Sequence, residues 1–198
     1  FRRVLFRSVI RFTSIHRLVG DFLTKLNYRN HRKIVVIDGK IGYTGGMNIN
    51  DHYFRQWRDT HLRIEGDAVA SLQLIFLNSW VTSGGRRDEP YPYFFPPPQP
   101  QEDGKLIQII ADEPGLDFHP IETSYEWALL HAKEYFFIQT PYFVPSTPVR
   151  SALKAAARSG VDVRVMIPAK ADNFFMGPAN KSFFRECLSS AFVSDGGK

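Results

Sequence analysis

The sequence predicts an α/β protein with mixed sheets, and three observations support this fold class. Residues 33–46 have the pattern of a β-hairpin, and residues 60–66 have the pattern of a further strand. From residue 105 to 190, strand-like and helix-like segments alternate, an order typical of parallel strands joined by helices. A proline-rich stretch at 84–104 separates these regions. We therefore expect two α/β units joined by a connector.

The first region is predicted to form a hairpin, a third strand and a helix. KIVVID at 33–38 is rich in β-branched residues, Asp38-Gly39 is a two-residue turn that favours hairpins, and KIGYTGG at 40–46 runs back. THLRIEG at 60–66 alternates as a strand does. Residues 67–82 place apolar side chains at helical spacing, which predicts a helix.

Residues 84–104, GGRRDEPYPYFFPPPQPQEDG, are predicted to be the connector, because prolines and charges exclude a helix and an interior strand. We expect its aromatic centre, YPYFFPPP, to pack on the protein surface. Contact with a membrane interface, which suits Tyr and Phe, is the alternative.

The second region is predicted to contain three strands and three helices in alternation. The strands are KLIQII at 105–110, YFFIQTPYF at 135–143 and VDVRVMIPA at 161–169, and the helices span 120–134, 147–160 and 178–190. This order predicts a parallel arrangement of the strands.

The composition is that of a globular protein. Of the 198 residues, 43% are hydrophobic and 23% are charged, which allows a buried core. Cys187 is the single cysteine, so neither an internal disulfide nor a multi-cysteine zinc site is possible. The most apolar run, residues 69–81, is interrupted by Gln73 and Asn78 and is shorter than the ~18 apolar residues of a membrane span.

The net charge of +5 is concentrated near the start of the chain. Residues 1–66 carry 13 basic and 5 acidic residues, whereas residues 67–198 carry 12 basic and 15 acidic ones. A basic region favours an anionic partner. Residues 1–8, FRRVLFRS, correspond to one reading frame of a common DNA-sequencing adapter. We expect them to be an artefact and the true start to lie upstream, so the net charge is a weak guide to the partner.

Residues 30–48, NHRKIVVIDGKIGYTGGMN, hold the densest group of reactive side chains. Residues two apart in an extended strand share a face, so His31 and Lys33 are predicted to point the same way. An imidazole beside an ammonium can attack or protonate at a phosphorus whose charge the lysine offsets. The following glycine pair lets the backbone approach closely and exposes N–H groups, and Asn48 adds an amide donor. This group suits a phosphodiester.

The spacing H-x-K-x4-D followed by G-G-x-N resembles the signature of the phospholipase D superfamily. The matching residues are His31, Lys33, Asp38, Gly45, Gly46 and Asn48. The flanking segments, among them WRDTHLRIEG and YFFIQTPYFVP, look like the bacterial cardiolipin synthases from about residue 27 to about 185. The resemblance implies a phospholipase D-like mixed-sheet sandwich with helices on both faces and two pseudo-repeats. We expect both to be incomplete, with 9–83 the end of the first and 105–198 the start of the second.

The resemblance also implies a two-step phosphatidyl transfer through a phosphohistidine, without a metal or other cofactor. His31 would be the nucleophile, and Lys33, Gly45, Gly46 and Asn48 would hold the phosphate. A nucleophilic histidine needs its other ring nitrogen fixed, and Asp59 is the candidate for this role. Its alternative is a surface pair with Arg55 or Arg58. Asp38 is grouped with the catalytic residues, although we expect it to stiffen the turn.

The sequence contains one copy of this motif. His131-Ala132-Lys133 imitates a second copy, but Ile138 stands where the Asp belongs, and a helix end favours His and Lys. His119 and His61 lack a neighbouring Lys and are interpreted as packing or surface residues. The second motif, whose histidine would protonate the leaving alcohol, is expected further downstream. The 198 residues alone are therefore expected to be inactive.

The implied partners are the anionic phospholipid phosphatidylglycerol and a membrane surface, with the bacterial inner membrane as the location. The sequence does not predict the oligomeric state. One alternative function is another superfamily activity, either a hydrolytic phospholipase D or a phosphatidylserine synthase. The other is a basic, nuclease-like module that binds nucleic acid. We expect no nucleic acid partner, because no aromatic stacking platform interleaves with the basic residues at 29–33.

Overall fold

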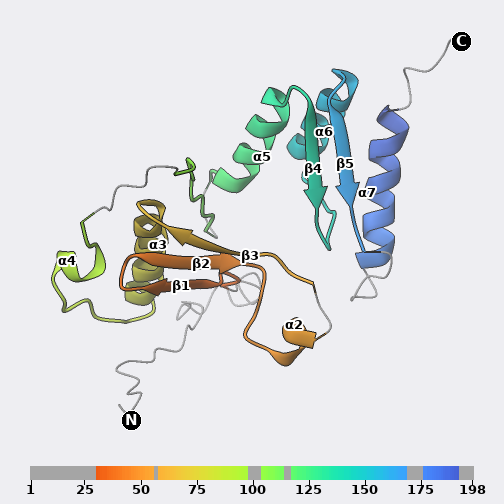
Figure 1. Ribbon diagram of the computed structural model, residues 1–198. Helices are drawn as coiled ribbons and strands as arrows, with labels where there is room; N and C mark the ends of the chain where they lie inside the picture. The colour runs from red at the N-terminus through yellow and green to blue at the C-terminus, as the bar shows by residue number, and fades with distance from the viewer. Residues whose placement is uncertain (1–29, 56–57, 98–103, 114–116, 169–175, 192–198) are drawn as a thin grey trace, which may run out of the picture. The chain divides into compact units, whose positions relative to one another are not determined.

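The computed structural model describes residues 30–55, 58–97, 104–113, 117–168 and 176–191. The chain divides into two compact units, residues 1–114 and 115–198, and each has a sheet of its own (Figure 1). The predicted α/β class with two sheets is therefore confirmed. The predicted artefact at 1–8 lies outside the described residues, and the predicted limits of the two repeats stay a prediction.

The first unit contains an antiparallel sheet in the order β1-β2-β3. Its strands are β1 (Ile34–Ile37), β2 (Ile41–Gly45) and β3 (His61–Glu65). In the register, Ile34 pairs with Thr44 and Gly45 pairs with His61. The start of β1, the end of β2 and the start of β3 therefore meet at one end of the sheet.

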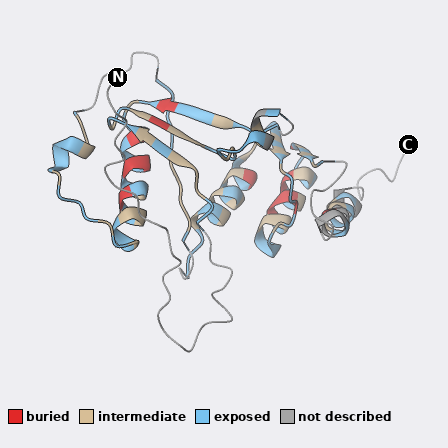
Figure 2. Cartoon of the chain, turned by 90° about the horizontal axis from the view of Figure 1, so that it is seen from below, coloured by how far each residue is buried: buried red, intermediate tan, exposed pale blue. Residues whose placement is uncertain are grey.

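Helix α3 (Ala68–Thr82) covers one face of this sheet. Val69 and Leu72 of the helix form a buried cluster with Ile64, and Ile34 and Val36 of β1 pack against it. Buried residues, red in Figure 2, lie along α3 and on the strands next to it. Because side chains alternate along a strand, the odd-numbered positions of β1 project from the face opposite α3.

The turn between β1 and β2 has the backbone geometry that the sequence predicts. Asp38 and Gly39 adopt positive φ angles of 54° and 66°, as a type I′ turn requires, and the Lys40 N–H donates to the Ile37 carbonyl at 3.0 Å. The last residue pair of the two strands is Ile37 with Ile41, so the loop between them contains three residues, one more than the predicted two-residue turn. Lys40 is that extra residue.

Two short helices were not predicted. Helix α2 (Asp51–Arg55) follows the glycine-rich segment, and α4 (Tyr91–Phe94) forms within the connector. The prediction that prolines exclude a helix from the connector is wrong at α4, because its proline lies in the first turn, where no backbone N–H is needed. A Cβ at Gly39 would lie 2.7 Å from the Phe94 carbonyl oxygen, so this part of the connector packs against the hairpin turn.

The predicted strand at 105–110 is not formed. These residues have no regular secondary structure, and Leu106 is fully exposed. Ile109 nevertheless packs against the cluster under α3. The apolar run therefore contributes Ile109 to this cluster, although among the described strands none pairs with it.

The second unit has the predicted alternation of helices and strands. It contains α5 (Pro120–His131), β4 (Tyr135–Gln139), α6 (Thr147–Arg158), β5 (Asp162–Met166) and α7 (Met176–Ala191). Strands β4 and β5 pair in parallel, with Tyr135 opposite Asp162. The three helices contribute Leu129, Leu153 and Phe183 to one cluster on the inner face of this sheet. Within the described residues, α3 thus covers one face of the first sheet, and α5, α6 and α7 pack on one face of the second.

No helix in the described ranges is both long and apolar enough to cross a membrane.

Candidate active site

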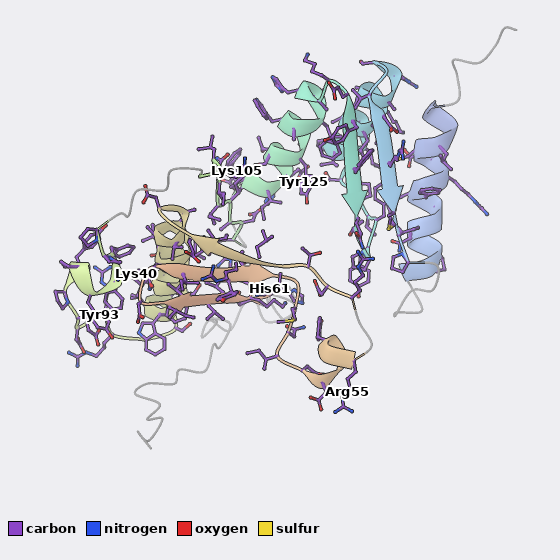
Figure 3. The ribbon with its side chains drawn as sticks, viewed as in Figure 1. Lys40, Arg55, His61, Tyr93, Lys105 and Tyr125 are labelled. Carbon is purple, nitrogen blue, oxygen red and sulfur yellow. The ribbon has the colours of Figure 1, made fainter. Side chains whose placement is uncertain are left out.

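The predicted site residues gather at one end of the three-stranded sheet, with the exception of Asp38. Figure 3 shows His61 at this end and Lys40, which follows the hairpin turn, at the opposite end. Asp38 lies in that turn, five residues along the chain from Lys33. At about 3.3 Å per residue, the two positions are roughly 17 Å apart. The structure therefore does not bring Asp38 together with the other predicted residues.

His31 and Lys33 lie together just before β1. The Nζ atom of Lys33 is 3.0 Å from Nδ1 of His31 and also donates to the His31 carbonyl oxygen at 2.7 Å. A lysine ammonium can only donate hydrogen bonds, so Nδ1 of His31 must accept this one. The neutral ring then carries its proton on Nε2. His31 is exposed and Lys33 is partly exposed.

Arg32, between them, is held by different partners. Its guanidinium donates to the backbone carbonyl of Asp112 and lies 3.5 Å from the carboxylate of Glu113. The alternation expected of an extended segment is therefore present. The segment before β1 is tied to residues 112–113 through Arg32, while its neighbours keep their own contact with each other.

The glycine pair at the end of β2 lies against the segment that leads into β3. The Gly46 N–H donates to the Thr60 carbonyl at 3.1 Å, so this N–H group is engaged within the protein. A Cβ at Gly46 would overlap the Asp59 carboxylate, whose Cγ would be 2.9 Å away. A Cβ at Gly45 would lie 2.7 Å from Nδ1 of His61. Both positions need glycine because the two segments approach so closely.

Asn48 makes a contact that the sequence does not predict. Its Nδ2 donates to the Tyr53 hydroxyl of α2 at 2.7 Å. Tyr53 lies five residues downstream, and no spacing rule links such a tyrosine to the motif. The short helix thus fixes the direction of the amide that the sequence assigns to the phosphate.

Asp59 lies beside Gly46, where its Oδ1 accepts a hydrogen bond from the Thr60 N–H at 2.8 Å. Across the described residues, no hydrogen bond joins Asp59 to His31 and no ion pair joins it to Arg55 or Arg58. The carboxylate is at the same end of the sheet as His31. Its predicted contact with the ring nitrogen of His31 is not made in this structure.

The sheet face opposite α3 is rich in polar and cationic groups. His61 and Arg63 of β3 project from it, since the intervening Leu62 and the following Ile64 belong to the other face. The pKa of Arg63 lies above its usual value because its guanidinium is hydrogen-bonded to Tyr43 and paired with Glu65. Glu65 therefore offsets the charge of Arg63, whereas Lys33, at the end of the sheet, offers its ammonium to an anionic group.

His131, which imitates the motif, has a local structural contact. Its Nδ1 lies 2.8 Å from the Trp127 carbonyl oxygen, and its ring stacks on Trp127 with the centroids 4.2 Å apart. It is the last residue of α5, as expected for a histidine that interacts with a helix C-terminus.

Comparison with known proteins gives one family match. Residues 127–194 match the model described as "Cardiolipin synthase, PLD-like domain". The match lies in the second unit, so it does not include the H-x-K-x4-D motif.

Curated relatives cover both units. The chain is 45% identical over 177 residues to cardiolipin synthase 1 of Staphylococcus aureus (strain COL), covering 84% of this chain and 35% of that protein. It is 44% identical over 177 residues to a probable cardiolipin synthase of Bacillus subtilis (strain 168), covering 85% and 35%. A cardiolipin synthase of Geobacillus thermodenitrificans is 42% identical over 172 residues, covering 84% and 34%. The chain thus spans about a third of the length of these relatives.

Proposed function

Over the length that it spans, the chain belongs to the cardiolipin synthase family with a phospholipase D-like domain, and from this membership we propose that it supplies one half of a phosphatidyltransferase site. The reaction would form cardiolipin from two molecules of phosphatidylglycerol. The observation that carries the proposal is the 3.0 Å contact between Lys33 Nζ and His31 Nδ1, at the sheet end where the glycine pair and Asn48 lie.

In the first step, His31 attacks the phosphorus of phosphatidylglycerol. A P–N bond forms while the P–O bond to the departing glycerol breaks, and the glycerol oxygen takes a proton from an acid on another copy of the motif. In the second step, a glycerol hydroxyl of a second phosphatidylglycerol attacks the phosphorus. A P–O bond forms, the P–N bond breaks, and the hydroxyl proton returns to the same group, now acting as base.

Lys33 has two tasks in this scheme. While its ammonium donates to Nδ1 of His31, the ring proton stays on Nε2, and that nitrogen has no lone pair with which to attack. When Lys33 turns to a phosphate oxygen, Nδ1 becomes free to hold the ring proton, and Nε2 becomes nucleophilic. Substrate binding would therefore activate His31. Asp59, at the same end of the sheet, is the proposed acceptor for the Nδ1 proton.

Asn48 is proposed to bind the substrate phosphate, whereas Asp38 is not. Asn48 offers the second hydrogen of its amide, since the first is directed at Tyr53. Asp38, in the far turn, serves the hairpin rather than the substrate. The substrate is an anionic lipid, so we propose that the site works at the surface of the bacterial inner membrane, without a cofactor.

A segment exchange tests this proposal. Residues 30–67 of this chain would replace the matching segment of the Staphylococcus aureus relative, and cardiolipin formation from phosphatidylglycerol vesicles would be measured by mass spectrometry. We expect the chimera to make cardiolipin. We expect His31→Ala within the exchanged segment to lower the rate about 10²- to 10⁴-fold, because the reacting group is lost.

Lys40→Ala is the matched control, since Lys40 is exposed at the opposite end of the same sheet. It should leave the rate within about twofold, as expected for a surface change away from the site. A His31→Ala chimera that keeps more than a tenth of the rate would refute the proposed role of His31.

A further inference from the structure

We propose that His61 is a second phosphate-binding residue of this site, and that it donates a hydrogen bond from Nε2 to an oxygen of the substrate phosphate. The inference rests on the proposed function, because it adds a contact to the same site. His61 lies outside the H-x-K-x4-D motif, and its sequence neighbours gave no reason to assign it a role.

The register of the sheet puts His61 and Lys33 on the two sides of Gly45. Gly45 pairs with His61, and Lys33 directly precedes Ile34, the partner of Thr44. Paired residues of neighbouring strands project from the same face, so Lys33 and His61 belong to one face, two strand spacings or about 10 Å apart. The residue between them has no side chain.

The imidazole of His61 uses the space that Gly45 leaves. A Cβ at Gly45 would lie 2.7 Å from Nδ1 of His61, so the ring lies directly beside Gly45. Any larger residue at position 45 would displace the ring. The glycine therefore serves the position of a histidine as well as the course of the backbone.

The two ring nitrogens of His61 are in different environments. Nδ1 is buried and, in the described part of the chain, has no hydrogen-bond partner. A buried N–H without an acceptor is more unfavourable than a buried lone pair without a donor, so the neutral ring should carry its proton on Nε2. The residue as a whole is partly exposed, so the distal Nε2–H is the group that can reach a ligand.

A donor at this position suits a phosphate oxygen. Lys33, just before β1, and His61 on β3 would approach one anion from two sides. Gly45 between them has no side chain that would occupy the space of the anion. The alternative is that His61 only fills space over Gly45. The two roles differ in which ring nitrogen matters, and this difference decides the choice of variants.

The variants are His61→Gln and His61→Asn. The amide nitrogen of Gln can reach about as far as Nε2, whereas that of Asn stops near the position of Nδ1. We expect Gln to retain binding of dimethyl phosphate, a small stable phosphodiester, within about threefold. We expect Asn to weaken it about tenfold, the effect of losing one hydrogen bond to a charged group. A packing role needs no donor at the end of the side chain, so it predicts that His61→Met, which has the length of Gln without an N–H group, binds as well as His61→Gln; the donor role predicts that it binds as weakly as His61→Asn.

The measurement is long-range ¹H–¹⁵N NMR of the histidine rings in the 198-residue chain at pH 8. In the unaltered chain it reports directly whether the His61 proton is on Nε2, so this result does not depend on how well a variant folds. Dimethyl phosphate is then titrated in. We expect the ring signals of His61 and His31 to move with one dissociation constant, and those of His131, whose Nδ1 contacts Trp127, to stay unchanged.

The inference is overturned by a proton on Nδ1 of His61, by His31 signals that move while those of His61 do not, or by equal binding in the Asn and unaltered chains. Movement at His61 without movement at His31 would support the contact of His61 and count against the proposed role of His31. If neither ring responds, both assignments fail.

Discussion

Gly46 and Asp59 share a space that has no room for an additional methyl group. A Cβ at Gly46 would overlap the Asp59 carboxylate. The φ angle of Gly46 is outside the left-handed region, so the effect of Gly46→Ala is steric. We expect this substitution to lower the free energy of unfolding by about 1–3 kcal/mol, the usual range for overpacking. Urea denaturation followed by circular dichroism measures it.

Asp59→Ala supplies the control, because it removes the group that the methyl would meet. In the double variant the penalty of Gly46→Ala should shrink by about 1 kcal/mol or more, the size of coupling seen between residues in contact. Strictly additive effects would mean that the two residues do not compete for this space.

At the residue scale, the spacing of residues along the chain predicts which way a side chain points better than it predicts which group the side chain contacts. The alternation of an extended segment places His31 and Lys33 together, as the H-x-K pattern indicates. The sequence cannot show that Lys33 contacts Nδ1, that Asn48 is bonded to Tyr53, or that Gly46 lies on Asp59. These contacts join segments whose approach depends on strand pairing and on α2. The sequence gives no reason to assign His61 the role proposed above, because its neighbour Gly45 lies on the adjacent strand.

Among the elements, α7 binds the segment after β4 through two hydrogen bonds of a buried side chain. Asn180 accepts from the Phe143 N–H at 2.8 Å and donates to the Pro141 carbonyl at 3.0 Å, and it is 3% exposed. We expect Asn180→Ala to lower the free energy of unfolding by about 1–3 kcal/mol, because the buried N–H of Phe143 loses its acceptor. Urea denaturation provides the value.

Asn78→Ala is a suitable comparison, since Asn78 is an exposed residue of α3. Its effect should stay within about 0.5 kcal/mol. If Asn180→Ala lowered the free energy of unfolding no more than Asn78→Ala does, the hydrogen bonds of Asn180 would not contribute measurably to stability.

The helices and strands that the sequence predicts well are those whose own residues show the full periodicity of a helix or a strand. Helices α3, α5, α6 and α7 and strands β1 to β5 form within a few residues of the predicted limits. The run at 105–110 has the composition of a strand but lacks a described partner, and a strand exists only through its pairing. Helix α4 forms because its proline occupies a tolerated position.

For the whole molecule, the number of motifs determines the activity to expect. These 198 residues contain one H-x-K-x4-D motif, so they do not supply the acid that the proposed scheme needs for the leaving glycerol. We expect the polypeptide alone to form no measurable cardiolipin, since general acid catalysis contributes about 10²–10⁴ to the rate and the second set of phosphate contacts adds to this. Synthesis by this polypeptide at the rate of the Staphylococcus aureus relative would contradict the two-motif scheme.

Binding by the whole polypeptide distinguishes a lipid enzyme from a nucleic acid module. We expect tighter association with phosphatidylglycerol vesicles than with single-stranded DNA in about 0.15 M salt, where exposed charges are screened beyond roughly 8 Å. Neutral phosphatidylcholine vesicles are the control. The opposite ranking would favour the nuclease-like alternative.

The fold class and the family could be predicted from the sequence because both depend on patterns along the chain. The alternation of elements gives the first, and the motif with its flanking segments gives the second. The arrangement of groups around the phosphate could not be predicted in the same way. It depends on which residues face one another across β1, β2 and β3.

The most direct test of the account is to find the atom that holds the phosphatidyl group. The chimera would be mixed with phosphatidylglycerol, quenched at high pH, where phosphohistidine survives, and its peptides analysed by mass spectrometry. The account predicts an acid-labile phosphatidyl adduct on His31, absent from the His31→Ala chimera. An adduct on another residue, in a chimera that forms cardiolipin at the full rate, would contradict it.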